Sequence, residues 1–149
     1  MQLFLGADHR GFRHKEFLEK KLIDEGYEVV DMGDLVFDKE DDYVDFARRV
    51  AESVADYPDS RGVLLCGSGA GVDMVANKID GVRSALVFDV ARAKQAREHE
   101  DANVISLPAD VLSEDSTYQV VKAFLETPFS GDQRHIRRLE KMEEVEGSN

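Results

Sequence analysis

The chain has 149 residues, of which 42% are hydrophobic and 34% are charged. This length suits one compact domain that buries a core without disulfides or a structural metal, so we expect a single domain over residues 1–149. The hydrophobic runs are far shorter than the roughly 20 residues needed to cross a bilayer, and the N-terminus lacks the basic stretch of a signal peptide. These features predict a cytoplasmic protein with no membrane segment.

The formal net charge is −12, which repels polyanions and argues against a nucleic-acid partner. One basic segment, residues 134–138, is too short to bind a duplex but could hold a single phosphate. Cys66 is the only cysteine, so the chain can form neither an intrachain disulfide nor a cysteine metal cluster. A free thiol suits a reducing compartment.

Short hydrophobic runs alternate with longer amphipathic segments, a pattern typical of βαβ units and a parallel sheet. We expect strands over residues 2–6, 27–32, 62–66, 82–88 and 103–107. We expect helices over residues 12–25, 43–57, 71–77, 89–99 and 115–126, and a last helix from residue 133 into a tail that is disordered from about residue 143. The predicted fold is an α/β, Rossmann-like, three-layer αβα sandwich with strand order 2-1-3-4-5.

In an open sheet of this kind, ligands bind beyond the carboxyl ends of the strands where the winding reverses, here between the first and third strands. The loops after those strands are residues 7–11 and 67–71. The second loop is glycine-rich and leads into a helix, so its N–H groups can converge on an anion. Val72 breaks the dinucleotide-binding fingerprint and no P-loop lysine follows, so the alternative is a tight turn without a ligand. The residues of this candidate anion hole are Gly67, Gly69, Ala70 and Gly71.

Cys66 ends the third predicted strand, directly before this loop. Such a position usually holds a small core residue, but a place just before a helix N-terminus also favours the thiolate form. A reactive Cys66 would be either a nucleophile with a histidine as its base, or a general base that removes a proton from carbon.

Asp8 and His9 follow the first strand and face the same switch point, where an acid and an imidazole suit proton transfer or recognition of sugar hydroxyls. The alternative is a turn aspartate beside a surface histidine. His99 ends a predicted helix, where a histidine is usually only a favourable charge against the helix dipole. No metal-ligand spacing connects these side chains, so we predict no metal.

Five segments carry a wider pattern: GADHRGF at residues 6–12, DYVDFA at 42–47, LCGSGAG at 65–71 with ANK at 76–78, REHEDANV at 97–104 and RHIRR at 134–138. Together they resemble the ribose 5-phosphate isomerase B family, which also contains the galactose 6-phosphate isomerase subunits. The resemblance extends over nearly the whole chain. It implies a homodimer, with a tetramer left open, whose active sites lie at the subunit interface and need no cofactor.

The resemblance also implies a reaction, the interconversion of ribose 5-phosphate and ribulose 5-phosphate, with the pentose phosphate pathway as its setting. Cys66 would be the base that moves a proton between C1 and C2 through a cis-enediolate, which Ser68 and the loop N–H groups would stabilise. Asp8 and His99 would assist ring opening and hold the sugar. The residues implied for the phosphate are His9, Arg134 and Arg138, with His135 nearby.

The chain departs from the family pattern at several positions. Some members use a glutamate just after the glycine-rich loop as the base, and Val72 stands there, which favours the cysteine type. Glu100 stands where the family usually has asparagine, and Asp110 where it usually has a phosphate-binding arginine. The first alternative is therefore another phosphosugar, namely allose 6-phosphate, galactose 6-phosphate or a tetrose phosphate. Further alternatives are a non-catalytic partner subunit and a cysteine-nucleophile hydrolase.

Overall fold

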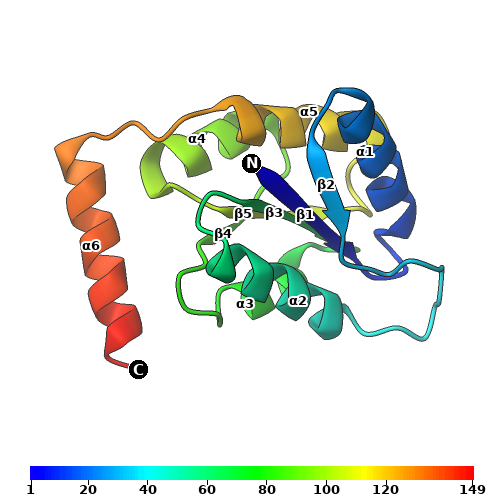
Figure 1. Cartoon of the computed structure of the whole chain (residues 1–149), viewed down its shortest axis with the longest axis horizontal. Helices are drawn as coiled ribbons and strands as arrows, with labels where there is room; N and C mark the ends of the chain where they lie inside the picture. The colour runs from blue at the N-terminus through cyan, green and yellow to red at the C-terminus, as the bar shows by residue number, and fades with distance from the viewer.

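The computed structural model describes residues 1–149 as five β-strands and six α-helices (Figure 1). The strands are β1 (Gln2–Ala7), β2 (Glu28–Asp31), β3 (Arg61–Cys66), β4 (Ser84–Leu86) and β5 (Val104–Pro108). The helices are α1 (Phe12–Asp24), α2 (Tyr43–Asp56), α3 (Ala70–Ala76), α4 (Val90–Glu100), α5 (Glu114–Glu126) and α6 (Gln133–Gly147). Every predicted element is present, although β2 and β4 are shorter than predicted. No helix is long and apolar enough to span a membrane.

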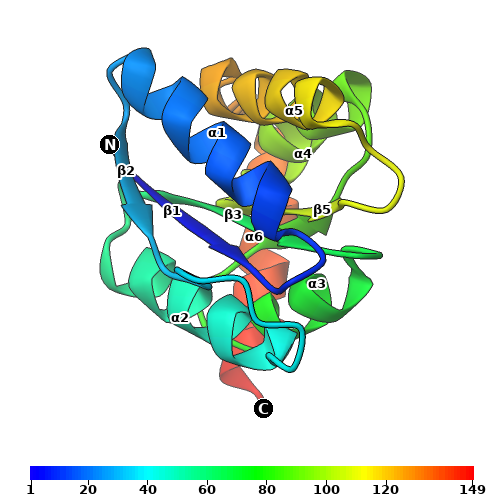
Figure 2. The same cartoon turned by 90° about the vertical axis from the view of Figure 1, so that its right-hand side faces the viewer.

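The strands form one parallel sheet between two helical layers. Helices α1, α4 and α5 cover one face, and α2 and α3 cover the other (Figure 2). Successive side chains of a strand point to opposite faces, so each strand contributes to two cores. Leu3 and Leu5 join the core beneath α1 and α5, whereas Phe4 packs into the core beneath α2. The predicted three-layer αβα sandwich is confirmed.

The strand order is β2-β1-β3-β5-β4, so the predicted order 2-1-3-4-5 is wrong for the last two strands. β5 pairs with β3, with Gly62 opposite Val104 and Cys66 opposite Pro108, and β4 pairs with the other side of β5. Burial explains why β5 rather than β4 lies beside β3, because all five residues of β5 are buried while none of the three residues of β4 is. A short, partly exposed strand suits the sheet edge, and a continuous hydrophobic strand suits the interior. The winding still reverses between β1 and β3.

Helix α2 packs directly on the backbone of the sheet. Its first turn is capped by Asp42, whose side chain accepts a hydrogen bond from the backbone N–H of Val44, and the face that carries Phe46, Val50 and Val54 is buried. Val50 lies over Gly6 and Gly62, because a Cβ added at these glycines would come within 2.7 Å and 2.9 Å of a Val50 methyl group. This close contact fixes the strands that lead into the two predicted site loops.

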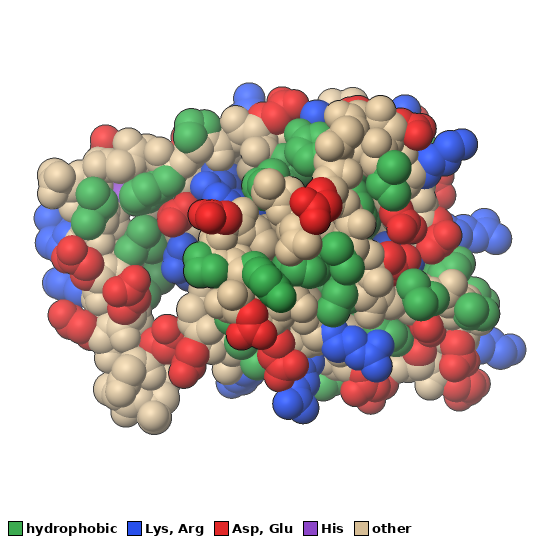
Figure 3. All heavy atoms as spheres, in the orientation of Figure 1, with side chains coloured by type: hydrophobic (Ala, Val, Ile, Leu, Met, Phe, Trp, Pro, Cys, Tyr) green, Lys and Arg blue, Asp and Glu red, His purple; other side chains and the backbone are tan.

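Helix α6 stands apart from the rest of the molecule, joined to it by the segment after α5 (Figure 1). A gap separates most of its length from the sheet, with hydrophobic side chains on either side (Figure 3). The C-terminal end of α6 contacts the rest of the chain through Glu146, whose carboxylate accepts a hydrogen bond of 2.9 Å from the N–H of Gly81. The helix continues to Gly147, so the expectation of disorder from about residue 143 is wrong.

Candidate active site

The loops after β1 and β3 lie side by side at the carboxyl edge of the sheet. Ala7 pairs with Leu65, and the N–H of Asp8 donates to the Leu65 carbonyl at 3.3 Å. Asp8 therefore lies next to Cys66, and the structure brings together the two loops that the switch-point argument selected.

Cys66 is buried at the end of β3, and its sulfur faces the glycine-rich loop. The backbone N–H of Gly69 donates to Cys66 Sγ at 3.1 Å. Gly69 can turn its N–H back in this way because it adopts a left-handed conformation, with φ of 73°, that favours glycine. The loop therefore directs a backbone donor at the sulfur atom that would act as a base or nucleophile.

Asp8 is almost fully buried and organises the first loop. Its Oδ1 accepts hydrogen bonds from the backbone N–H groups of Arg10, at 2.9 Å, and Gly11, at 3.2 Å. Burial raises the pKa of Asp8, and these two donors oppose the rise only in part. Asp8 is therefore a carboxyl group that keeps its proton to a higher pH than an exposed aspartate does.

His9 is fixed by Asp41, a residue that sequence analysis did not select. Asp41 Oδ1 lies 2.7 Å from His9 Nδ1 and also accepts the backbone N–H of His9 at 3.1 Å. The Asp41 hydrogen bond raises the pKa of His9, which favours the imidazolium. Because Nδ1 is occupied by Asp41, Nε2 is the ring nitrogen left for a ligand.

Sequence analysis also missed two contacts around the glycine-rich loop. Tyr43 packs on Gly71, where an added Cβ would come within 2.7 Å of the tyrosine ring. Arg10 forms an ion pair with Asp110 across the start of the loop. Tyr43 lies within the DYVDFA segment, so the family resemblance could have identified it. Asp41 carries no local sequence signal, and although Arg10 and Asp110 were both noted in the sequence, nothing there indicated that they pair.

The remaining predicted residues form a second group around the junction of α4 and α6. The rings of His99 and His135 stack with centroids 4.5 Å apart, and His135 Nδ1 lies 2.7 Å from Ser130 Oγ. His135 is buried by these contacts, so within one chain it supports His99 rather than facing a ligand. Arg134 and Arg138 are exposed on α6.

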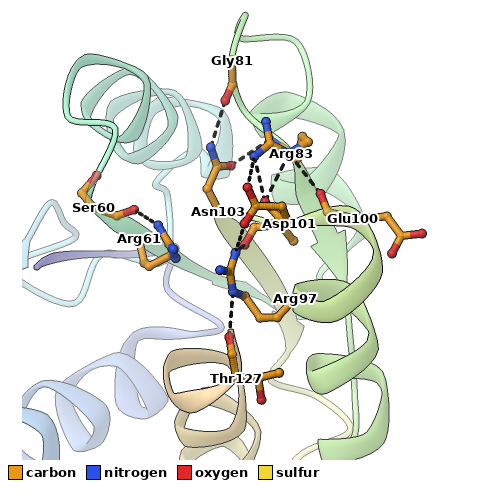
Figure 4. Close-up of polar contacts among 10 residues, drawn as sticks. Ser60, Arg61, Gly81, Arg83, Arg97, Glu100, Asp101, Asn103 and Thr127 are labelled. Atoms are coloured by element: carbon orange, nitrogen blue, oxygen red, sulfur yellow. Dashed lines mark hydrogen bonds and ion pairs between the residues drawn. The ribbon is translucent and has the colours of Figure 1, made fainter. Parts of the chain in front are cut away.

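A network of arginine contacts fixes the end of α4 that carries His99 (Figure 4). Arg97 is buried and donates to the carbonyls of Thr127, at 3.2 Å, and Ala102, at 2.6 Å. Asp101 ends the helix and accepts from Arg97 at 2.8 Å and from Arg83 at 3.1 Å. His99 therefore projects from a rigid helix end.

The two groups lie at opposite ends of the sheet. Helix α4 leads into Val104, the first residue of β5, which pairs with Gly62 near the start of β3. Cys66 pairs with Pro108 at the other end of β5, about 13 Å further along at roughly 3.3 Å per residue. One chain therefore brings Cys66, Asp8 and His9 together but leaves His99 and the α6 arginines away from them.

Two clusters of side chains have the composition of metal sites. Asp8, His9 and Asp41 offer ligand atoms within 4.8 Å of one another, and His9 Nδ1 and Asp41 Oδ1 are hydrogen-bonded to each other. The second cluster, Glu16, Glu19 and Asp31, surrounds the ammonium group of Lys15, which pairs with Glu16 and Asp31. A hydrogen bond therefore holds two members of the first cluster together, and the charge of Lys15 balances the second cluster.

Comparisons with known proteins show similarity in sequence and fold over nearly the whole chain. A family model described as Ribose/Galactose Isomerase matches residues 3–142. A Mycoplasma genitalium protein named probable ribose-5-phosphate isomerase B is 40% identical over 141 residues, which cover 94% of this chain and 92% of that protein. A crystal structure of ribose-5-phosphate isomerase B from Mycoplasma genitalium with bound ribulose-5-phosphate has a TM-score of 0.96 at 38% identity, covering 99% of this chain and 97% of that one. The type B ribose 5-phosphate isomerase of Trypanosoma cruzi has a TM-score of 0.94 at 38% identity, with full coverage of both chains.

Proposed function

The chain belongs to the ribose/galactose isomerase family, and we propose that it interconverts ribose 5-phosphate and ribulose 5-phosphate. As a member of this family it is a sugar-phosphate isomerase. The main observation in support of this substrate and mechanism is the position of Cys66 Sγ. The sulfur accepts a hydrogen bond from the N–H of Gly69 and lies beside the buried carboxyl group of Asp8. Isomerisation of an aldose needs a base at carbon and a stabilised enediolate, and this pair of loops supplies both.

Cys66 is the base that moves the proton. In the open-chain aldose, the Cys66 thiolate removes the proton from C2, and the C1 carbonyl oxygen becomes the enediolate oxygen. The proton then returns to C1 while the proton of the C2 hydroxyl group passes to the C1 oxygen, which leaves a hydroxyl group at C1 and a ketone at C2, so the sugar gains and loses no atoms. Asp8, whose pKa is raised by burial, donates its proton to the ring oxygen when the sugar ring opens.

The glycine-rich loop stabilises the enediolate. The N–H groups of Gly69 and Ala70 already donate to Cys66 Sγ, at 3.1 Å, and Ser68 Oγ, at 3.2 Å. Those of Gly67 and Gly71 donate to no atom of the chain, so they are free for an enediolate oxygen. The predicted anion hole thus divides into donors that prepare the base and donors that face the substrate.

A second copy of the chain completes the site. His99 lies at the amino end of the sheet and cannot reach the Cys66 of its own chain, so the His99 that holds the sugar comes from the partner of a homodimer. Arg134 and Arg138 of the partner then bind the phosphate together with His9. Association as a tetramer would leave this pairing unchanged.

The surface on either side of the α6 gap suits this association. Leu86, Phe88 and Val90 are exposed at and beyond the edge strand β4, and Met142 and Val145 are exposed on α6. Apolar side chains that gather on a free edge strand and a detached helix mark an interface, and a second copy is the occupant that also supplies the missing His99. The single free thiol suits a reducing compartment, so we place the protein in the cytoplasm.

The test is ketose formation from ribose 5-phosphate by the purified protein in the presence of excess chelator. Turnover supports the substrate and a mechanism that uses only the side chains described above. If a folded dimer gives no ketose from ribose 5-phosphate, the substrate is wrong.

A different phosphosugar is the second candidate, because Glu100 and Asp110 depart from the family pattern near the predicted sugar and phosphate positions. A panel of allose 6-phosphate, galactose 6-phosphate and tetrose phosphates distinguishes it. Turnover of one panel member keeps the isomerase mechanism and changes the substrate. No turnover of any member favours a non-catalytic partner subunit.

A further inference from the structure

An ion pair spans the entrance to the Cys66 loop. Arg10 follows β1 and Asp110 follows β5, and Arg10 Nη2 donates to Asp110 Oδ2. Their side chains are 56% and 44% exposed, respectively. An ion pair this exposed contributes little to folding stability, so stabilisation alone does not account for its place at the site.

Both partners are held by the backbone of the site itself. The N–H of Asp110 donates to the Gly67 carbonyl at 3.0 Å, and the N–H of Ala109 donates to the Cys66 carbonyl at 2.9 Å. The N–H of Arg10 donates to Asp8 at 2.9 Å. The ion pair therefore has a fixed position relative to the proposed base.

The pair lies directly against Gly67. A Cβ added at Gly67 would come within 2.7 Å of Arg10 Cζ and 2.8 Å of Asp110 Oδ2, so the pair occupies the space beside the Gly67 backbone. A ligand that touches the guanidinium group is consequently also within reach of the loop that begins at Gly67.

The guanidinium group retains donors for a ligand. Only Nη2 of Arg10 bonds within the chain, so Nε and Nη1 are free. A guanidinium fork binds two oxygens of one phosphate or carboxylate, and the chain otherwise carries a net charge of −12 that repels such an anion. Asp110 keeps this cation at the site entrance.

We propose that Arg10 binds the phosphate group of the sugar phosphate and that Asp110 is the positioning residue that orients it. This inference rests on the proposed function for the identity of the substrate, but the binding of a phosphate at Arg10 does not depend on turnover. Arg10 is then a specificity-determining residue that distinguishes the phosphorylated sugar from the free sugar.

The test compares Arg10→Ala with Arg13→Ala, a matched control that removes one exposed cation from the neighbouring helix α1. Calorimetric titration with inorganic phosphate measures binding without turnover, and steady-state kinetics with ribose 5-phosphate measures KM and kcat. We expect Arg10→Ala to weaken phosphate binding and raise KM by about ten-fold with a smaller change in kcat, and Arg13→Ala to change neither. Loss of phosphate binding in Arg10→Ala supports the inference even if ribose 5-phosphate is not the substrate. Equal or absent phosphate binding in the wild type and Arg10→Ala overturns it.

A double-mutant cycle tests the positioning role of Asp110. We expect Asp110→Asn to raise KM in the wild-type background, by about three-fold, and to have no further effect on KM in the Arg10→Ala background. A structural defect at Asp110 would instead raise KM in both backgrounds. That result, or tighter phosphate binding by Asp110→Asn alone, overturns the positioning role.

Discussion

His9 Nδ1 and Asp41 Oδ1 lie 2.7 Å apart, and they join the loop after β1 to the loop that precedes α2. The Asp41 side chain is only 5% exposed, and its second oxygen has no hydrogen-bond partner. A buried carboxylate in this position gains most from a protonated partner, which agrees with the raised pKa of His9. We call this pair the latch, because it joins the two loops. It is an ion pair only when His9 is protonated, so its strength depends on pH.

We predict that Asp41→Asn makes the protein less stable at pH 6 but has a smaller effect at pH 9. The pKa of His9 is raised in the folded state, so the latch contributes fully below the unfolded value of about 6.5 and is lost as the pH rises through the folded value. Asp8 and Arg10 also face His9, and Asp34 faces Asp41. Burial raises the pKa of both Asp8 and Asp34.

Urea unfolding at the two pH values measures the effect. His9→Asn is the companion variant, because its amide can still donate to Asp41 but does not titrate, and it should also flatten the pH dependence of stability. The idea fails if Asp41→Asn lowers the free energy of unfolding equally at pH 6 and pH 9.

The sequence predicted what local patterns determine. The hydrophobic runs that became β1 and β3, together with the glycine-rich turn after Cys66, place the first half of the site at the correct edge of the sheet. Hydrophobicity did not distinguish the positions of β4 and β5, because both are short apolar runs and their order depends on which strand can be buried on both faces.

Contacts between residues far apart in the chain could not be predicted from the sequence. Asp41 meets His9 across 32 residues, and Asp110 meets Arg10 across 100. Nothing in the immediate surroundings of Asp41 distinguishes it from the other acids of a chain with 31 of them, and the sequence marked Asp110 only as a departure from the family pattern, without its partner. The separation of His99 from Cys66, by contrast, already follows from the predicted parallel sheet, because His99 precedes the start of one strand and Cys66 ends another.

Cys66→Ala should abolish isomerisation while leaving the protein folded. Removal of a general base usually costs 10²–10⁴-fold, so we expect kcat to fall by roughly 10³-fold. The substitution removes one buried sulfur atom from a core that retains its other side chains, so the unfolding midpoint should change little. The measurement is ketose formation alongside thermal unfolding, and retention of most of the wild-type kcat would eliminate Cys66 as the base.

Gly69→Ala should damage both the fold and the reaction. Alanine is strained at a φ of 73°, and its Cβ would come within 2.9 Å of the Leu107 backbone, which displaces the N–H from Cys66. We expect a loss of about 1–2 kcal/mol in stability and about 10²-fold in kcat. Gly81→Ala is the matched control, because Gly81 has a φ of 80° but nothing within 4 Å of an added Cβ. Gly81→Ala should lose stability alone, and an equal loss of kcat in both variants would contradict the role of the Gly69 N–H.

If His99 serves the Cys66 of the partner chain, two inactive variants should restore activity when they pair. In a heterodimer of Cys66→Ala and His99→Ala chains, one site combines an intact Cys66 with an intact His99, and the other site lacks both. We expect such a heterodimer, purified through two different tags, to have about half of the wild-type kcat per dimer, although each parent homodimer is inactive.

The matched control is the heterodimer of Cys66→Ala and Asp8→Asn chains. Cys66 and Asp8 lie on neighbouring strands of one chain, so each site of that heterodimer lacks one of the two groups and should remain inactive. Recovery in the first heterodimer but not in the second means that the subunit interface divides the site between Cys66 and His99. Recovery in neither would mean that His99 acts within its own chain, and the apolar surfaces of β4 and α6 would then need a different explanation.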